Sequence, residues 1–382
     1  MVWTTPRTHD RRSVLRLLGV GAGAMLAGPA LSACGAAHGE TDPSAIGGSL
    51  DEIIARAQKE GTVRLMGYPE TWANYRGHFR DFEKKYGVKV HVDSPDAHSA
   101  EELQAVLNLQ GQSTQPDVLD VGYSFTSAAI EQGLIESYKP SNFDAIPENL
   151  KDPDGLWVGA YYGVISVGIN RAACPVPHRF EDLLRPEYRG KVAMPGDPRK
   201  GAASIATVCA AATARGGSVE NAGPGIEYFA ELAHRGNLVS VADAGQAMST
   251  GQAAAIFDWN YNWLGREEQL RRDGIDFEYV VLDDGVFGNY YAQPITIGSP
   301  QPNAARLWVD WLTSDEGAEH YALGGAIPAR FTELVAAGAL SEEALAKLPE
   351  PSILEQVTLP TPAQGDAANV AIATRWGREV VI

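Results

Sequence analysis

Short apolar runs and helical patterns alternate along the chain from residue 50 onward. After Ser49, apolar residues recur at Leu50, Ile53 and Ile54, which predicts an amphipathic helix that ends near Gly61. A short apolar run at 62–66 then predicts a strand. Further strands are predicted at 88–92, 117–121, 157–169, 191–194, 238–241, 254–257, 277–282 and 291–297, and further helices at 72–86, 100–109, 127–132, 202–213, 225–234 and 245–250.

This alternation predicts an α/β fold with parallel sheets whose two faces are covered by helices. Extended segments at 157–169 and 283–297 are natural crossings between two lobes, so we expect two α/β lobes with a cleft between them. Ligands of open α/β sheets lie beyond the carboxyl ends of the strands. We therefore expect the cleft to be formed by the strand-end loops Gly67–Trp72, Gly122–Phe125, Pro195–Ser204, Asp258–Trp263 and Gly288–Gln293.

Residues 1–33 have the pattern of an export signal. Arg11 and Arg12 precede an uncharged apolar run, 17–31, that is shorter than the about 20 residues of a membrane span. The arginine pair and the mild hydrophobicity predict twin-arginine export. Leu-Ser-Ala-Cys at 31–34 is similar to a bacterial lipobox, so we expect cleavage before Cys34 and acylation of its thiol. The alternative is an ordinary secretory signal with an incidental cysteine. The small, polar residues at 34–48 are expected to form a flexible tether.

Composition and charge exclude some classes of function. The formal net charge of −17 argues against nucleic acid as a partner, since an acidic surface repels phosphates. Cys174 and Cys209 either form a disulfide or remain two buried thiols. No Cys/His spacing typical of zinc is present, and we expect neither a metal site nor a cofactor.

The sequence has none of the usual catalytic motifs. Gly-x-Ser-x-Gly, His-Glu-x-x-His and P-loop patterns are all missing, so we expect no enzymatic activity. His91, Asp93, Asp96 and His98 cluster after the strand at 88–92, where we expect a solvated turn.

Four segments carry a resemblance to a known family. They are Gly61–Leu65, Pro116–Ile135, Phe180–Val192 and Pro302–Pro328, in that order along the chain. In the third, Phe-Glu-Asp-Leu-Leu-Arg-Pro-Glu-Tyr-Arg-Gly-Lys-Val, Phe180 replaces the family's usual Trp. Over roughly residues 50–340 the chain resembles the family 1 extracellular solute-binding proteins, which include spermidine/putrescine-, ferric-ion- and thiamine-binding proteins.

The resemblance implies the type II periplasmic-binding fold and a role in ABC import. Lobe 1 is then expected at 49–163 and 290–347, lobe 2 at 164–289, and a helical C-terminal segment at 348–382 packs on lobe 2. Together with the export signal and the lipobox-like residues 31–34, it implies a monomeric, exported, lipid-anchored protein on the outer face of the cytoplasmic membrane or in the periplasm. Such a protein closes two lobes on a small molecule and docks on the permease subunits.

Two charged residues after the strand at 191–194 are candidates for the ligand site. Asp197 matches an aspartate that pairs with a ligand ammonium in the polyamine binders, and its alternative role is to cap the following helix. Lys200 stands where those proteins have a second acid, which argues against a diamine held by two carboxylates. It leaves room for an anionic group at the helix start near Ser204, where N–H groups are free.

Two aromatic residues follow the strand at 254–257. Trp259, with Asn260, matches a Trp-Asn pair of the polyamine binders in which the indole covers the ligand. The alternative is packing at a strand end. Tyr261 is a single tyrosine where the ferric-ion binders have adjacent ones, and a single phenol weakens the case for iron.

Gly288–Gln293 resembles a Gly-x-Tyr-x-Gln stretch of the thiamine binders, which makes Tyr291 and Gln293 candidates. Neighbouring side chains of an extended segment face opposite ways, so only one of Tyr290 and Tyr291 should face the cleft. By position alone, the opposite wall is expected to contain Tyr68, Thr71, Trp72, Tyr123 and Ser124.

These residues favour a small organic cation, polyamine-like or thiamine-like, as the ligand. Ferric ion and a zwitterionic aminophosphonate are the alternatives within transport. A cell-surface protein without a transport role is the alternative outside it.

Overall fold

The structure is a computed structural model that describes residues 41–382. The expected export signal, the lipobox and Cys34 lie outside the described residues. Within them, no helix combines the length and the apolarity that a membrane span requires.

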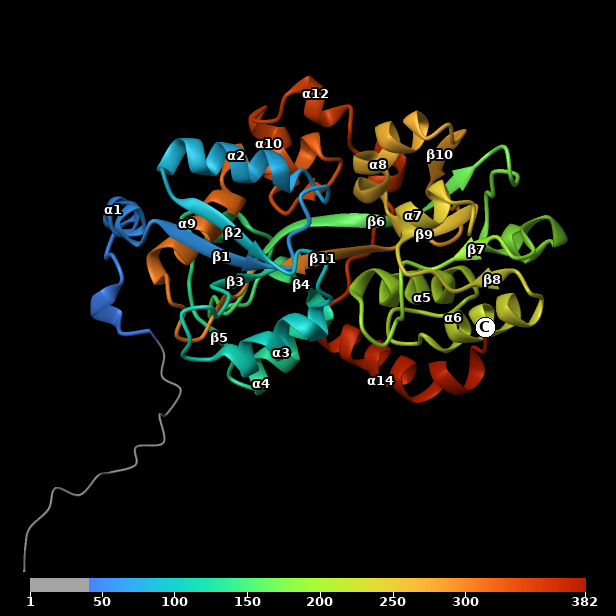
Figure 1. Cartoon of the computed structure of the whole chain (residues 1–382), viewed down its shortest axis with the longest axis horizontal. Coiled ribbons are helices and arrows are strands. Elements are labelled where there is room, and N and C mark those ends of the chain that lie inside the picture. The colour runs from blue at the N-terminus through green and yellow to red at the C-terminus, as the bar shows by residue number, and fades with distance from the viewer. Residues whose placement is uncertain (1–40) are drawn as a thin grey trace, which may run out of the picture. The chain divides into compact units, whose positions relative to one another are not determined.

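The first sheet has the strand order β2-β1-β3-β12-β5 (Figure 1). Strand β1 (Thr62–Met66) is parallel to β2 (Lys89–Asp93) and β3 (Val118–Leu119). Strand β12 (Ile295–Thr296) is antiparallel to β3 and to β5 (Ile135–Glu136). The helices of this lobe are α1 (Leu50–Glu60), α2 (Tyr75–Tyr86), α3 (Ser99–Leu109), α4 (Thr126–Glu131), α9 (Pro302–Thr313) and α10 (Asp315–Leu323).

The second sheet has the order β4-β11-β6-β9-β7-β8, and β10 and β13 also pair with β6. Its strands are β4 (Val121–Gly122), β6 (Gly159–Asn170), β7 (Val192–Ala193), β8 (Leu238–Val239), β9 (Ala255–Trp259), β10 (Phe277–Val280), β11 (Gly288–Ala292) and β13 (Ile327–Pro328). The helices beside it are α5 (Ala202–Ala214), α6 (Gly223–His234), α7 (Ala244–Ser249) and α8 (Asn260–Arg272).

The two lobes are joined by long strands, which confirms the predicted two-lobe α/β fold. Strand β6 pairs with β9 in the second lobe and with β11 and β13 closer to the first. All of these pairings are antiparallel, so the expectation of parallel sheets holds only for part of each sheet, which in the second sheet is β7 with β8 and β9. The long crossing strand returns beside its neighbours in the opposite direction, whereas β1, β2 and β3 keep the parallel arrangement that intervening helices require.

Local signals fixed many element boundaries. Helix α1 begins after Ser49, whose side chain accepts a hydrogen bond from the Glu52 amide, and ends at Gly61 with φ of 77°. The expected loop at 260–263 is wrong, because these residues begin helix α8. Residues 288–292 form strand β11, which agrees with the extended crossing expected at 283–297. The expected strand at 117–121 is divided at Asp120 into β3 and β4.

The C-terminal part contains α11 (Phe331–Ala337), α12 (Glu342–Leu345), α13 (Pro351–Leu354) and α14 (Pro362–Glu379). Helix α14 packs on α5 and α6 and also on α4 and the short 3-10 helix η2 (Tyr123–Phe125). It therefore lies across elements of both lobes (Figure 1).

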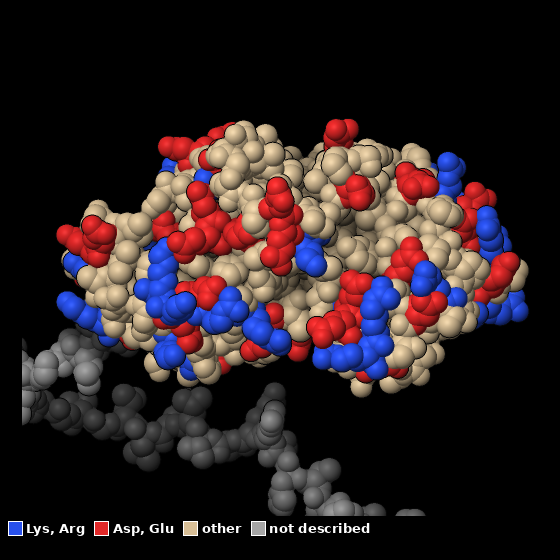
Figure 2. All heavy atoms as spheres, turned by 90° about the horizontal axis from the view of Figure 1, so that it is seen from above, with Lys and Arg blue, Asp and Glu red and all other residues tan. Residues whose placement is uncertain are grey.

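Cys174 and Cys209 are buried free thiols. Burial raises the pKa of the Cys174 thiol to about 11 and that of Cys209 to about 12, so both are unreactive at neutral pH. On the face shown in Figure 2, acidic and basic side chains are interspersed over both halves of the described part.

Candidate ligand-binding cleft

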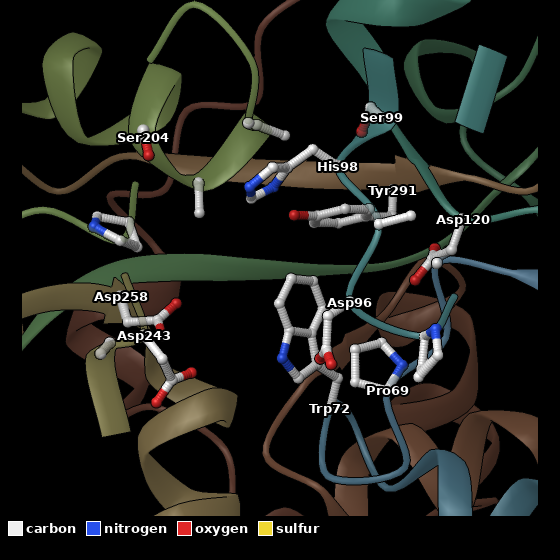
Figure 3. A pocket seen from close by; sticks show the side chains of 18 of the residues that line it. Pro69, Trp72, Asp96, His98, Ser99, Asp120, Ser204, Asp243, Asp258 and Tyr291 are labelled. Carbon is white, nitrogen blue, oxygen red and sulfur yellow. The ribbon is translucent and has the colours of Figure 1, made fainter. Parts of the chain in front are cut away.

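A cavity of about 260 Å³ lies where the carboxyl ends of strands from both lobes meet (Figure 3). Loops after β1 and β2 supply one side, and loops after β7 and β8, together with Asp258 of β9 and Arg266 of α8, supply the other. Helices α3, α5 and α7 begin at its walls. This is the position at which open α/β sheets hold ligands.

The wall from the first lobe contains a pair of buried carboxyl groups, Asp120 and Glu102. Asp120 accepts hydrogen bonds from the hydroxyls of Tyr75 at 2.9 Å and Tyr161 at 3.0 Å, and from the Gln293 amide. The Asp120 N–H donates to Glu102 Oε2 at 3.0 Å. Burial raises the pKa of Asp120 to about 7, although these donors lower it. Burial and the nearby Asp120 raise the pKa of Glu102 well above its ordinary value.

The wall from the second lobe contains an ion pair. Arg266 of α8 donates to Asp258 Oδ2 at 2.7 Å and lies 3.9 Å from Asp243 Oδ2. Asp243 also caps α7, because its Oδ1 accepts a hydrogen bond from the backbone N–H of Gln246 at 2.6 Å. Both carboxylates on this wall therefore have a partner within the lobe.

Aromatic rings lie between the two walls. Trp72 is half-buried and meets Tyr291 edge to face, with ring centroids 5.9 Å apart. Tyr290 points to the other face of β11, where it stacks on Trp157 at 5.7 Å. The alternation expected along this segment thus places Tyr291, and not Tyr290, at the cavity.

A family model for bacterial extracellular solute-binding proteins matches residues 113–355. The chain belongs to this family. An uncharacterized protein of Haemophilus influenzae is 27% identical over 249 residues, which are 62% of this chain and 69% of that protein.

Two solved structures show the same fold as this solute-binding protein. The periplasmic binding protein AfuA of Actinobacillus pleuropneumoniae, with fructose-6-phosphate bound, has a TM-score of 0.65 at 19% identity and covers 83% of this chain and 98% of its own. Iron-bound HitA of Pseudomonas aeruginosa has a TM-score of 0.63 at 18% identity and covers 84% of this chain and 99% of its own.

Three of the residues proposed from the sequence line the cavity: Trp72, Ser204 and Tyr291. Four others lie buried behind it. The Trp259 ring is fully buried and its Nε1 donates to the Tyr291 hydroxyl at 3.3 Å. Tyr261 stacks on Trp259 at 6.1 Å, while Gln293, which Tyr68 contacts, reaches Asp120. These four support the residues that line the cavity.

Tyr123 and Ser124 are covered by the C-terminal helix. Gly365 of α14 lies against both side chains, and Asn369 donates to the Ser124 carbonyl at 2.9 Å. Thr71 is exposed and lies in a neighbouring groove lined by charged residues of α2 and α8.

Asp197 and Lys200 lie outside the cavity lining. Asp197 Oδ1 accepts from the Arg199 backbone N–H and from Arg199 Nε, both at 2.9 Å. This pairing with Arg199 lowers the pKa of Asp197 below its ordinary value. The alternative role as a helix cap does not involve its side chain, since Gly201 is the residue before α5 and no side chain caps that helix. Lys200 is exposed.

Sequence reasoning missed most of the charged residues of the cleft. Asp96 and His98 were expected in a solvated turn; both are exposed but also line the cavity. They follow the carboxyl end of β2, so the rule used for the other strands would have found them. Asp120 and Glu102 lie within apolar patterns that gave no sign of a site. The other missed residues are Asp243 and Arg266, whereas Asp258 lies in a segment that was expected at the cleft but was not proposed as a ligand contact.

Proposed function

We propose that this solute-binding protein captures a small organic cation, polyamine-like or thiamine-like, for an ABC importer. The observation that carries the proposal is the excess of acid in the cavity lining. Its described charged residues are the acids Asp96, Glu102, Asp120, Asp243 and Asp258 and the single base Arg266, besides His98.

The uncompensated acid lies on the first lobe. Arg266 neutralises Asp258 and lies near Asp243, which leaves Asp96 and the pair Asp120 and Glu102. An ammonium group near Asp120 would favour its ionised form and form a charge-assisted hydrogen bond. Such bonds contribute about 1.5–3 kcal/mol.

The aromatic rings support the same class of ligand. The indole of Trp72 and the phenol of Tyr291 stand between the two walls, where their faces and edges can cover an apolar stem or a cationic ring. A cation over an indole gains about 0.5–2 kcal/mol.

Ferric ion is a weaker candidate. Of the described tyrosines only Tyr291 lines the cavity, and burial raises the pKa of its phenol well above the ordinary value. The ligands named for AfuA and HitA, a sugar phosphate and iron, differ in charge from each other. The choice of ligand class therefore rests on the residues that line the cleft and not on the ligands of these two similar structures.

Transport requires that ligand binding changes the protein. A ligand that contacts both lobes stabilises the closed arrangement by its differential affinity, and the closed form would dock on the permease. We further propose that twin-arginine export and acylation at Cys34 place the protein, as a monomer, on the outer face of the cytoplasmic membrane or in the periplasm.

The test is a thermal-shift panel on ligand-stripped protein with putrescine, spermidine, thiamine, ferric citrate and fructose-6-phosphate. A ligand at 100 times its dissociation constant adds about 2.7 kcal/mol to stability. We expect a shift with an organic cation, weakened in Asp96→Asn and retained in Asp144→Asn, a matched exposed acid outside the cavity. Stabilisation by ferric citrate or fructose-6-phosphate alone would contradict the proposal.

A further inference from the structure

The start of helix α5 at the cavity has unused hydrogen-bond donors. The backbone N–H groups of Ala202, Ala203 and Ser204 have no acceptor in the described part of the chain. The preceding residue, Gly201, has no side chain to cap them, and the first turn contains no acid. The positive end of the helix dipole is therefore uncompensated.

A second, independent observation points to a ligand at this place. Ser204 is 1% exposed, and its hydroxyl has no hydrogen-bond partner among residues 41–382. A buried hydroxyl without a partner is costly. Ser204 nevertheless lines the cavity, so a bound group can reach the hydroxyl (Figure 3).

The other helices that begin at the cleft are already compensated. Helix α3 has Glu101 and Glu102 in its first turn, and Asp243 caps α7. The free donors are therefore concentrated at α5, while the cavity acids without a basic partner among the described residues are Asp96, Glu102 and Asp120. Figure 3 shows Ser204 and Asp120 toward opposite ends of the pocket, with Tyr291 between them.

We propose that the ligand also carries an oxyanion, a carboxylate or a phosphonate or phosphate group, bound by the amides of residues 202–204 and the Ser204 hydroxyl. This inference rests on the proposed function, because it adds an anionic end to a ligand whose cationic end faces Asp120. The ligand class is then a short zwitterion that spans the cavity. A helix start of this kind binds anions through its N–H groups and its dipole.

Two variants test the anion subsite. Ser204→Ala removes an unpartnered hydroxyl, so the ligand-free protein should keep its melting temperature. The affinity of this variant for a zwitterion should fall on the order of tenfold, as expected when a hydrogen bond to a charged group is lost.

The second variant, Gly201→Asp, places a carboxylate beside the same amides. Gly201 has φ of −120° and ψ of 136°, which any residue adopts. A Cβ there would lie 3.4 Å from the His98 ring. We expect the ligand-free Gly201→Asp protein to be more stable than the wild type and to bind zwitterions no more tightly than simple amines.

The probes share a two-carbon unit and differ in their charged groups: 2-aminoethylphosphonate and β-alanine are zwitterions, ethylamine is the cation, and ethylphosphonate is the anion. Calorimetric titration of each into the wild-type protein and both variants gives the affinities. Ser240→Ala, a serine outside this cavity, is the control. We expect a zwitterion to bind more tightly than ethylamine, and both variants to remove that advantage.

Each outcome separates this inference from the proposed function. Equal affinity for ethylamine and the zwitterions, unchanged in the variants, would overturn the anion subsite and leave cation binding intact. Binding of ethylphosphonate with no binding of any amine would support the subsite and contradict the cationic ligand. If neither ethylphosphonate nor either zwitterion binds the wild-type protein at millimolar concentration, the proposed anion subsite is contradicted.

Discussion

Gly265 of α8 lies directly against the carbonyl oxygen of Thr71, at one side of the cleft. A Cβ atom at residue 265 would lie 2.5 Å from that oxygen, closer than carbon and oxygen approach in proteins. Thr71 belongs to the loop after β1 in the first lobe and Gly265 to the second. The missing side chain at residue 265 therefore allows the two lobes to approach here.

Gly265→Ala should weaken ligand binding without weakening the fold. Alanine in a helix interior is favoured over glycine by about 1 kcal/mol. The ligand-free protein should therefore keep its stability if the lobes move apart at Thr71 to make room for the methyl group. The methyl group opposes closure, and we expect the affinity to fall by roughly tenfold or more. Denaturant unfolding and calorimetric titration measure the two effects separately.

The matched control on the same helix is Glu268→Ala. The Glu268 side chain is 83% exposed, so its removal adds no group between the lobes. If Gly265→Ala and Glu268→Ala bind ligand equally well, the contact with Thr71 does not control closure.

Trp72 and Trp259 should respond differently to truncation. Trp72→Ala removes a half-buried ring that lines the cavity, and we expect about tenfold weaker binding of a cationic ligand with little change in stability. Trp259 is fully buried, so Trp259→Ala should cost about 3–5 kcal/mol of unfolding free energy. Chemical denaturation together with ligand titration distinguishes them, and a stable Trp259→Ala variant that alone loses affinity would reverse these assignments.

Local signals in the sequence predicted the elements better than the site. Strand β1 has the predicted bounds because an apolar run follows a helix stopped by Gly61. The start of α8 was missed because Trp259 to Trp263 have the aromatic and amide composition of a loop. Only the pairing with β6 shows that the strand ends at Trp259.

The site depended on contacts that are distant in sequence. Tyr123 and Ser124 follow a strand, as cleft residues do, but α14 comes from more than 200 residues later and covers them. Asp197 has the negative charge that a cation site requires, but its carboxylate forms an ion pair with Arg199, two residues away. Asp120 could not be identified because its function depends on tyrosines from α2 and β6 that surround it only in the folded chain.

Cys34→Ser should release the protein from the membrane. Acylation requires the thiol, and a serine hydroxyl is not a substrate for the same modification, so the variant should appear in the soluble extracytoplasmic fraction. Cell fractionation with immunoblotting detects the difference. Cys209→Ser changes a buried thiol and serves as the control that should stay attached. A Cys34→Ser protein that still sediments with membranes would contradict the lipid anchor.

The affinity for a cationic ligand should depend on pH through Asp120. In the ligand-free protein burial raises the pKa of this carboxyl to about 7, and an ammonium group requires its ionised form. Below about pH 7 the ligand must displace a proton, so affinity should fall by up to about tenfold for each unit of pH. Burial and Asp120 also raise the pKa of the neighbouring Glu102, whereas Asp96 is exposed and Asp258 is paired with Arg266.

The stability of the ligand-free protein should change in the opposite direction. The pKa of Asp120 is raised above that of the unfolded chain, about 3.9, so the folded state binds more protons between about pH 4 and pH 7. The contribution of Asp120 to the free energy of unfolding is therefore largest below about pH 4 and decreases as the pH rises to about 7. Asp120→Asn should flatten both profiles, while Asp144→Asn should leave them unchanged. Urea unfolding and calorimetric titration at about pH 5 and about pH 8 measure them. If affinity and stability both rise with pH in the wild type, Asp120 is not the group that couples protons to the ligand.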